Sequence, residues 1–208
     1  FPQYASSTSG SIFQLAFTHM RNWFTFPDVQ TISQFFRHPA FIEAFAQKGR
    51  AYRPETYDHI VFSYHGLPKR QVDKVHPHTD SDSCSCTSET PAHGAFCYKN
   101  AAYETTRLLR RALKIPAEKS TVAFQSRLSD KWLKPFTDQV ITDLARQGHK
   151  RVLVFSPAFV ADCLETTVEI NYENAALFRE NGGEELTLVE SLNADDHWVE
   201  ALGKIITE

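Results

Sequence analysis

The chain has 208 residues, of which 42% are hydrophobic and 23% are charged. This composition is typical of a globular protein and excludes a disordered or fibrous one. The 22 Lys and Arg residues against 25 Asp and Glu residues give a net charge of −3, which argues against a nucleic-acid partner, because phosphate contacts need an excess of positive charge. No run of about 18 apolar residues and no signal peptide are found, so we expect a cytoplasmic protein without a membrane span.

Hydrophobic periodicity and chain breakers predict helices that alternate with strands. In chain order, we expect helices over residues 11–24 and 40–48, a strand over 59–64, a helix over 98–113, a strand over 121–125, a helix over 137–147, a strand over 151–156, a helix over 163–180, a strand over 186–192 and a helix over 195–206. Such an alternation builds βαβ units, whose parallel strands are covered on both faces. The predicted fold is therefore α/β, a three-layer αβα sandwich with a four-stranded parallel sheet.

Ligands of open α/β sheets bind beyond the carboxyl ends of the strands. Four stretches follow the predicted strands and are expected to converge there: His65, Ser126–Arg127, residues 157–165 and Asn193. His65 precedes Gly66, which lets a ligand or the backbone approach closely. Because imidazole exchanges protons near neutral pH and binds metals, His65 is a candidate base or metal ligand; the alternative is a structural histidine at a strand end.

Three glutamates, Glu165, Glu169 and Glu173, follow at intervals of four. On an α-helix this spacing puts successive carboxylates about 40° apart around the axis and about 6 Å along it. Such a row of carboxylates, the glutamate file, can accept protons or conduct a divalent cation. The alternative is an ordinary solvated helix face. Glu165 also lies at the junction of strand and helix, where this fold places ligands.

Three of the four cysteines, Cys84, Cys86 and Cys97, lie in one polar segment. Without a signal peptide a disulfide scaffold is not expected, and clustered cysteines are then typical of a metal or redox site. The Cys-x-Cys spacing suits zinc imperfectly, whereas iron–sulfur clusters follow looser spacing rules. The fourth ligand stays open between Cys163, a cysteine outside this chain and the histidines His76, His78 and His93. The alternative is a surface loop without metal.

Taken together and in this order, the motifs of the chain resemble those of ferrochelatases. They are Phe1-Pro-Gln-Tyr4 with Ser7-Thr-Ser-Gly10, Phe62-Ser-Tyr-His65-Gly-Leu-Pro68, Phe124-Gln-Ser-Arg127, Trp132-Leu-Lys-Pro-Phe-Thr-Asp138 and Pro157-Ala-Phe-Val-Ala-Asp162-Cys-Leu-Glu165-Thr166. The resemblance covers essentially all 208 residues. It implies two Rossmann-like lobes with a porphyrin cleft between them, of which this chain supplies the second lobe and the end of the first.

The resemblance also implies a domain organisation. Residues 1–57 are expected to form the end of the first lobe with connecting helices, residues 58–193 the chelatase lobe with a cysteine-rich insert at 74–98, and residues 194–208 a C-terminal helix. The chain starts at Phe1 and contains a single methionine, Met20, so we expect a chain truncated at its N-terminus. The absent lobe is expected to carry the membrane-contacting lip, which makes a peripheral membrane contact part of the expectation.

The activity that the resemblance implies is that of a lyase, which inserts its metal substrate Fe²⁺ into protoporphyrin IX to form protohaem in haem biosynthesis. Two pyrrole N–H protons must leave as the cation enters, so a base is needed beside the macrocycle. His65 and Glu165 match the catalytic, metal-handling positions, and Asp162 matches a residue that orients them. Glu169 and Glu173 match the acidic ion or proton route.

Further positions match the porphyrin pocket. Trp132 and Phe159 match aromatic wall positions, and Ser7 and Thr8 match a polar loop near the cleft. The insert resembles that of a bacterial subgroup with a [2Fe–2S] cluster, for which the candidate ligands here are Cys84, Cys86, Cys97 and Cys163. A coproporphyrin ferrochelatase and a non-catalytic iron–sulfur or porphyrin-binding module of the same fold are the alternatives.

Overall fold

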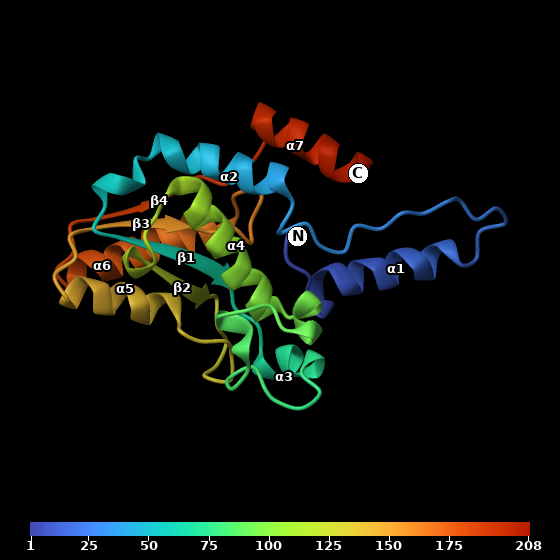
Figure 1. Ribbon diagram of the computed structural model, residues 1–208, viewed down its shortest axis with the longest axis horizontal. Helices are drawn as coiled ribbons and strands as arrows, with labels where there is room; N and C mark the ends of the chain where they lie inside the picture. The colour runs from blue at the N-terminus through green and yellow to red at the C-terminus, as the bar shows by residue number, and fades with distance from the viewer.

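A single parallel sheet forms the centre of the molecule (Figure 1). The computed structural model describes the backbone of residues 1–208 and every side chain except those at positions 92 and 93. The strands are β1 (His59–His65), β2 (Ser120–Gln125), β3 (Arg151–Phe155) and β4 (Glu185–Leu188), and their order in the sheet is β2-β1-β3-β4. All three pairings are parallel, and Phe62 lies opposite Val122 on one side and Phe155 on the other.

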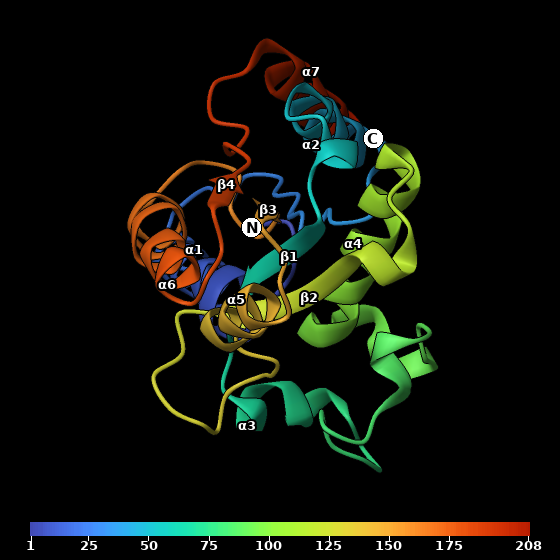
Figure 2. The same ribbon diagram turned by 90° about the vertical axis from the view of Figure 1, so that its left-hand side faces the viewer.

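Helices cover both faces of this sheet (Figures 1 and 2). One face is covered by α2 (Pro39–Ala51) and α4 (Tyr98–Leu113), with α7 (Asp196–Thr207) packed against α2, and the other face by α5 (Thr137–Arg146) and α6 (Ala175–Glu180). Because side chains alternate along a strand, Phe62 belongs to the first core while Val61 belongs to the second. The predicted α/β sandwich with its four-stranded parallel sheet is confirmed.

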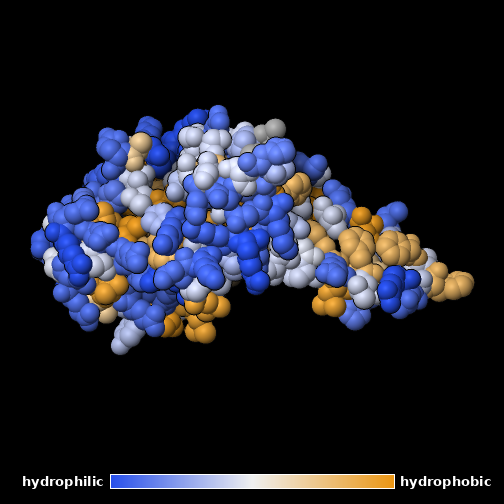
Figure 3. Space-filling view, turned by 90° about the horizontal axis from the view of Figure 1, so that it is seen from below, coloured by the Kyte–Doolittle hydropathy of each residue, from blue (hydrophilic) through white to orange (hydrophobic). Residues whose placement is uncertain are grey.

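The helix α1 (Ser11–Met20) projects away from the sandwich (Figure 1). It follows a short π-helical turn, Ser6–Gly10, and none of its own residues is buried. Figure 3 shows apolar side chains along this projecting arm, and the exposed ones include Leu15, Trp23 and Phe24. The helix ends at Met20, earlier than the predicted 11–24. Across the described residues, no helix combines the length and apolar character needed to cross a bilayer.

The insert between β1 and α4 contains short helical pieces rather than a long element. They are α3 (Lys69–Val72) and 3₁₀ turns at Asp73–Val75, Ser85–Thr87 and Ala92–Phe96. The insert reaches α4 at Cys97, directly before the first residue of that helix.

Two further predicted elements differ from the structure. The helix expected over 163–180 is a π-helix over Glu165–Asn174 and becomes the α-helix α6 only at Ala175. At its start, the Cys163 carbonyl accepts the backbone N–H of Thr167 at 2.9 Å and also the hydroxyls of Thr166 and Thr167, at 3.0 and 2.8 Å. The fourth strand ends at Leu188 instead of residue 192, because the chain beyond it turns toward the loop that follows β3.

Candidate active site

The residues that follow the strands meet at the carboxyl edge of the sheet. A pocket of about 440 Å³ lies there, beside the end of β1 and the loop after β3. Six of the predicted site residues line it: Ser7, Thr8, His65, Trp132, Phe159 and Glu165. The parallel topology therefore brings together residues that are up to 158 positions apart in the sequence, counting from 7 to 165.

His65 ends β1, and its imidazole is held in one orientation. Its Nδ1 lies 2.7 Å from the carbonyl oxygen of Gly66. A carbonyl only accepts hydrogen bonds, so Nδ1 carries the proton and the lone pair of the neutral ring is on Nε2. The main chain is fixed as well, because the Tyr98 hydroxyl donates to the His65 carbonyl at 2.8 Å. The pocket thus contains one oriented nitrogen base.

Two aromatic rings flank this imidazole. The ring centroids of Trp132 and Phe159 each lie 6.2 Å from that of His65. Trp132 is held close because the neighbouring Leu133 donates its N–H to the Leu67 carbonyl at 3.0 Å. A Cβ at Gly66 would lie 3.2 Å from the Trp132 ring, so glycine at this position permits the close packing. The walls suit a flat apolar ligand.

Glu165 lines the same pocket at the start of the π-helix. A hydrogen bond from the Cys163 thiol, followed by its own backbone N–H, lowers the pKa of Glu165, and the nearby His65 adds a smaller electrostatic contribution. Burial and the hydrogen bond to Glu165 raise the pKa of Cys163 in turn. The pocket therefore combines an ionised carboxylate with the imidazole of His65, and the thiol stays protonated beside them.

Asp162 joins the loop after β3 to the segment after β4. Its carboxylate accepts hydrogen bonds from the Asn193 side chain at 2.8 Å, the Thr166 hydroxyl at 3.0 Å and the Ser191 backbone at 3.3 Å. Burial alone would raise the pKa of Asp162, but these hydrogen bonds outweigh it and the pKa is lowered. Asp162 does not line the pocket. Its contacts instead hold the loop that carries Glu165.

The other two glutamates face a neighbouring, more polar hollow of about 510 Å³. Glu169 accepts hydrogen bonds from the Ser126 backbone N–H at 2.6 Å and from the Ser126 hydroxyl at 2.5 Å. Ser126 has a φ of 60°, and this left-handed turn directs its N–H toward the carboxylate. Glu173 lines the same hollow together with Arg127. The predicted file of glutamates is therefore divided between two cavities.

Gln125, the last residue of β2, connects the two cavities. Its side-chain N–H groups donate to the Glu165 carbonyl at 2.6 Å and to the Glu169 carboxylate at 3.4 Å. The Ser63 hydroxyl donates to its amide oxygen at 2.7 Å, which fixes the orientation of the amide. Sheet and π-helix are thus joined beside the site.

A family model described as Ferrochelatase matches residues 1–208. The chain belongs to the ferrochelatase family. The ferrochelatase of Pseudomonas putida is 37% identical over 207 residues, which are 97% of this chain and 61% of that protein. The ferrochelatase of Legionella pneumophila is 34% identical over 211 residues, which are 100% of this chain and 62% of that protein. The chain thus spans about 61% of the length of the curated relatives it matches.

This ferrochelatase-family chain carries a second group of candidate ligands in its insert. The donor atoms of His76, Cys86 and Cys97 all lie within 4.8 Å of one another, and the three residues are buried. Cys84 is buried beside them and its thiol is hydrogen-bonded to Cys86. Burial is the main reason that the pKa values of Cys86 and Cys97 are raised. These donors suit a metal that binds thiolate and imidazole.

The remaining ligand candidates lie elsewhere. Cys163 is in the loop after β3, where it contacts Glu165 and Thr166, and it does not belong to the insert. His78 is exposed. The side chain of His93 is not among those that the structure describes. A [2Fe–2S] cluster needs four protein ligands; the insert brings together His76, Cys86 and Cys97, and Cys84 is hydrogen-bonded to Cys86.

Sequence reasoning did not identify two residues that shape the pocket. Tyr98 begins α4 and reaches the His65 carbonyl, but nothing in its local sequence points to that contact. Gln125 lies inside a motif shared with the family, and its position at the end of a strand was the available signal. Both contacts depend on tertiary packing between segments far apart in the chain.

Proposed function

We propose that this chain carries the metal-insertion site of a ferrochelatase, which inserts Fe²⁺ into protoporphyrin IX and releases the two pyrrole protons. The observation that supports this most strongly is the pairing of an oriented imidazole and an ionised carboxylate in one pocket with aromatic walls. Membership of the family supports the same conclusion.

His65 is proposed as the base. Because its Nδ1 proton is engaged by the Gly66 carbonyl, Nε2 offers the lone pair that accepts a pyrrole proton. The strand end and the hydrogen bond from Tyr98 hold the backbone in place, so the imidazole requires little reorganisation during the reaction. Proton transfer at this nitrogen frees one pyrrole nitrogen to bind the incoming cation.

Glu165 is proposed to balance charge during metal entry. Its lowered pKa keeps the carboxylate ionised at neutral pH, so that it attracts Fe²⁺ and stabilises the protonated form of His65. Asp162 is a positioning residue, because it holds the loop and does not line the pocket. Glu169 and Glu173 are proposed to collect cations or release protons through the outer hollow.

The porphyrin is proposed to lie against Trp132 and Phe159, which offer two aromatic surfaces beside the base. Ser7 and Thr8, in the turn before α1, also line the pocket and supply hydroxyl groups. This arrangement allows apolar contact with the ring and polar contact at its rim.

The exposed apolar arm supports a peripheral membrane contact as a further part of the proposal. The side chains of Leu15, Trp23 and Phe24 are exposed, and an aromatic-rich apolar surface favours the membrane interface. Sedimentation with neutral phospholipid vesicles tests this, and Phe24→Ser, which alters the most exposed of these residues, is expected to reduce binding. Equal sedimentation of both proteins would argue against the contact.

The resemblance to the cluster-bearing subgroup leads us to propose a [2Fe–2S] cluster in the insert. The convergence of His76, Cys86 and Cys97, with Cys84 hydrogen-bonded to Cys86, supports a metal centre at this place. When bound, such a cluster would supply electron-transfer chemistry, while the steps at the pocket are carried out by the residues described above.

The decisive experiment measures Fe²⁺ insertion by the natural gene product, with protoporphyrin IX and coproporphyrin in parallel assays. We expect His65→Ala to lower the insertion rate by about 10²–10⁴-fold, the range for loss of a general base. We expect Glu165→Gln to lower it by about 10²–10³-fold, as for loss of a preorganised electrostatic contact. The exposed residues His197 and Glu118 provide matched controls, His197→Ala and Glu118→Gln.

The results separate the alternatives. Faster insertion into coproporphyrin would assign the other substrate. Porphyrin binding without insertion, measured by fluorescence quenching, would favour a non-catalytic module. Full activity in both pocket variants would refute the proposed roles of His65 and Glu165.

A further inference from the structure

The insert contains a compact group of donor atoms outside the active-site pocket. His76, Cys86 and Cys97 are 5%, 0% and 0% exposed, and their donor atoms lie within 4.8 Å of one another. A tetrahedral ion with metal–sulfur distances of about 2.3 Å and metal–nitrogen distances of about 2.0 Å holds its ligand atoms about 3.5–3.8 Å apart. His76 Nε2 lies 3.4 Å from Cys86 Sγ, which fits two ligands of one metal.

The orientation of His76 supports its role as a ligand. Its Nδ1 lies 2.9 Å from the carbonyl oxygen of Val72, which can only accept a hydrogen bond. Nδ1 therefore carries the proton, and the lone pair of Nε2 is directed toward the Cys86 sulfur. Metal-bound histidines are held in this manner, with the second ring nitrogen donating to a carbonyl or carboxylate.

Cys97 and Cys84 complete a set of four donors. Cys97 is the N-cap of the 16-residue helix α4, and its sulfur accepts the Asn100 backbone N–H at 3.4 Å. Cys84 is buried two residues before Cys86, and its thiol is hydrogen-bonded to Cys86.

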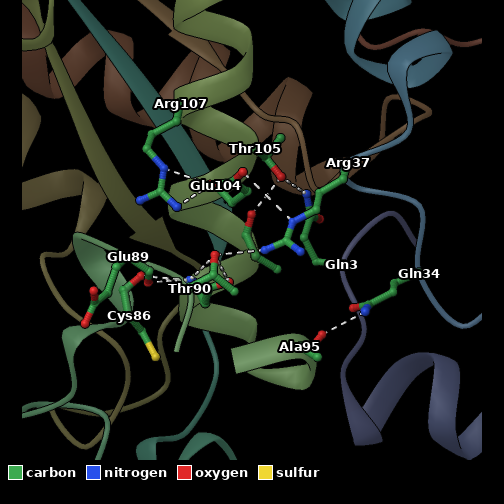
Figure 4. Close-up of polar contacts among 12 residues, drawn as sticks. Gln3, Gln34, Arg37, Cys86, Glu89, Thr90, Ala95, Glu104, Thr105 and Arg107 are labelled. Atoms are coloured by element: carbon green, nitrogen blue, oxygen red, sulfur yellow. Dashed lines mark hydrogen bonds and ion pairs between the residues drawn. The ribbon is translucent and has the colours of Figure 1, made fainter. Parts of the chain in front are cut away.

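Polar contacts fix the backbone around these donors (Figure 4). The Asn100 side chain donates to the carbonyls of Cys86 and Glu89 at 3.2 and 2.9 Å. In Figure 4 the Cys86 sulfur points away from this network. The Lys99 ammonium, which is also buried, donates to the Ser81 carbonyl at 2.5 Å. The donors therefore sit on a scaffold that is organised by helix α4.

We propose that His76, Cys84, Cys86 and Cys97 form one metal centre with an imidazole and three thiolate ligands, and that His76, rather than Cys163, completes the set. This ligand set accepts zinc or an iron–sulfur cluster, since both bind thiolate and imidazole. The inference deepens the proposed metal centre of the insert. It does not depend on chelatase activity, because its test measures metal binding and not Fe²⁺ insertion.

The centre has a direct structural connection to the pocket. Cys97 is followed by Tyr98, whose hydroxyl donates to the His65 carbonyl at 2.8 Å. A metal bound to Cys97 would therefore restrain the residue that precedes Tyr98, and Tyr98 in turn holds the main chain of His65. Tyr98 also lines the pocket.

The experiment uses the natural gene product, purified without oxygen. Elemental analysis and an assay for acid-labile sulfide distinguish zinc from an iron–sulfur cluster: we expect either one zinc, or iron with an equal amount of sulfide. Chelated protein is then titrated with Co²⁺, whose visible spectrum reports thiolate ligands. We expect His76→Ala to weaken Co²⁺ binding by at least about 10-fold, the lower end for changes next to metal ligands. We expect His76→Cys to retain binding, with loss of the nitrogen hyperfine coupling seen by pulsed EPR of the paramagnetic centre.

Two variants serve as matched controls. His78→Ala replaces an exposed histidine of the same insert, and Cys163→Ser replaces the cysteine of the pocket loop. Both should bind Co²⁺ like the unaltered protein. Circular dichroism checks that His76→Ala is folded, and retained binding by His76→Cys supports the site if it is not. Absence of any bound metal and of Co²⁺ uptake, unchanged affinity in folded His76→Ala, or loss of the metal in Cys163→Ser would overturn the proposal.

Discussion

Replacing Asp162 with asparagine changes one atom at the junction of two loops. In the native protein one carboxylate oxygen accepts from Thr166 and Ser191, and the other accepts from the Asn193 side chain at 2.8 Å. The new amide nitrogen would face the Asn193 nitrogen, so two donors would oppose each other. Asn193 cannot simply turn its amide, because its own oxygen accepts the Asp162 backbone N–H at 2.9 Å.

The cost follows from these contacts. A hydrogen bond to a charged group contributes about 1.5–3 kcal/mol, and the partial exposure of Asp162 favours the lower part of that range. We therefore expect Asp162→Asn to lower the free energy of unfolding by about 2 kcal/mol. For a chain of this size that corresponds to a decrease in Tm of about 4–8 °C. The exposed Asp143 on α5 provides a control, Asp143→Asn, which should change Tm little.

The pH dependence gives a second measurement. The folded-state pKa of Asp162 is below its ordinary value of 3.8, so the stabilisation is fully present above that value and is lost as the pH falls through the folded-state pKa. The difference in Tm between the native protein and Asp162→Asn should thus be large at pH 7 and shrink below pH 3.8. Equal Tm values for Asp162→Asn and Asp143→Asn at pH 7, or a difference that does not change on acidification, would refute this account of the loop.

The remaining predictions concern the walls of the pocket. Tyr98→Phe leaves the His65 carbonyl without its hydrogen bond from the hydroxyl, and we expect thermal unfolding to show a loss of about 1–3 kcal/mol; an unchanged Tm would show that the bond contributes nothing. Gly66→Ala places a Cβ 2.8 Å from the Gln125 carbonyl and 3.2 Å from Trp132, and we expect a cost of about 1–3 kcal/mol with a shift in Trp fluorescence. Native fluorescence and stability in Gly66→Ala would contradict the close packing inferred there.

The sequence was sufficient to predict the sheet and the edge at which the candidate site residues meet, because both follow from local patterns. Strands such as His59–His65 are short apolar runs, and a parallel sheet gathers the residues that follow them. The division of the glutamate file was not predictable. It depends on Ser126, which lies in a left-handed turn and donates its backbone N–H to the carboxylate of Glu169, 43 positions later in the chain.

Other features also required the folded structure. The π-helix over Glu165–Asn174 is one of them, because the apolar pattern of the sequence does not distinguish a π-helix from an α-helix. Among the candidate ligands of the insert, spacing alone gave no reason to prefer His76 over His78. The choice depends on burial and on the Val72 carbonyl that orients the His76 ring. Sequence patterns indicate where such a site lies, but the packing of the folded chain decides which residues belong to it.

The position of His65 at the end of an inner strand has a consequence for whatever occupies the pocket. β1 is hydrogen-bonded to β2 on one side and β3 on the other, and close-packed interiors yield little to pressure. At His65 itself the strand pairs with Gln125 of β2, since the pairing with β3 ends at Phe62, and the Tyr98 hydroxyl holds the His65 carbonyl. A ligand that binds beside this imidazole therefore meets a nitrogen whose position is fixed by the strand end and the Tyr98 hydroxyl.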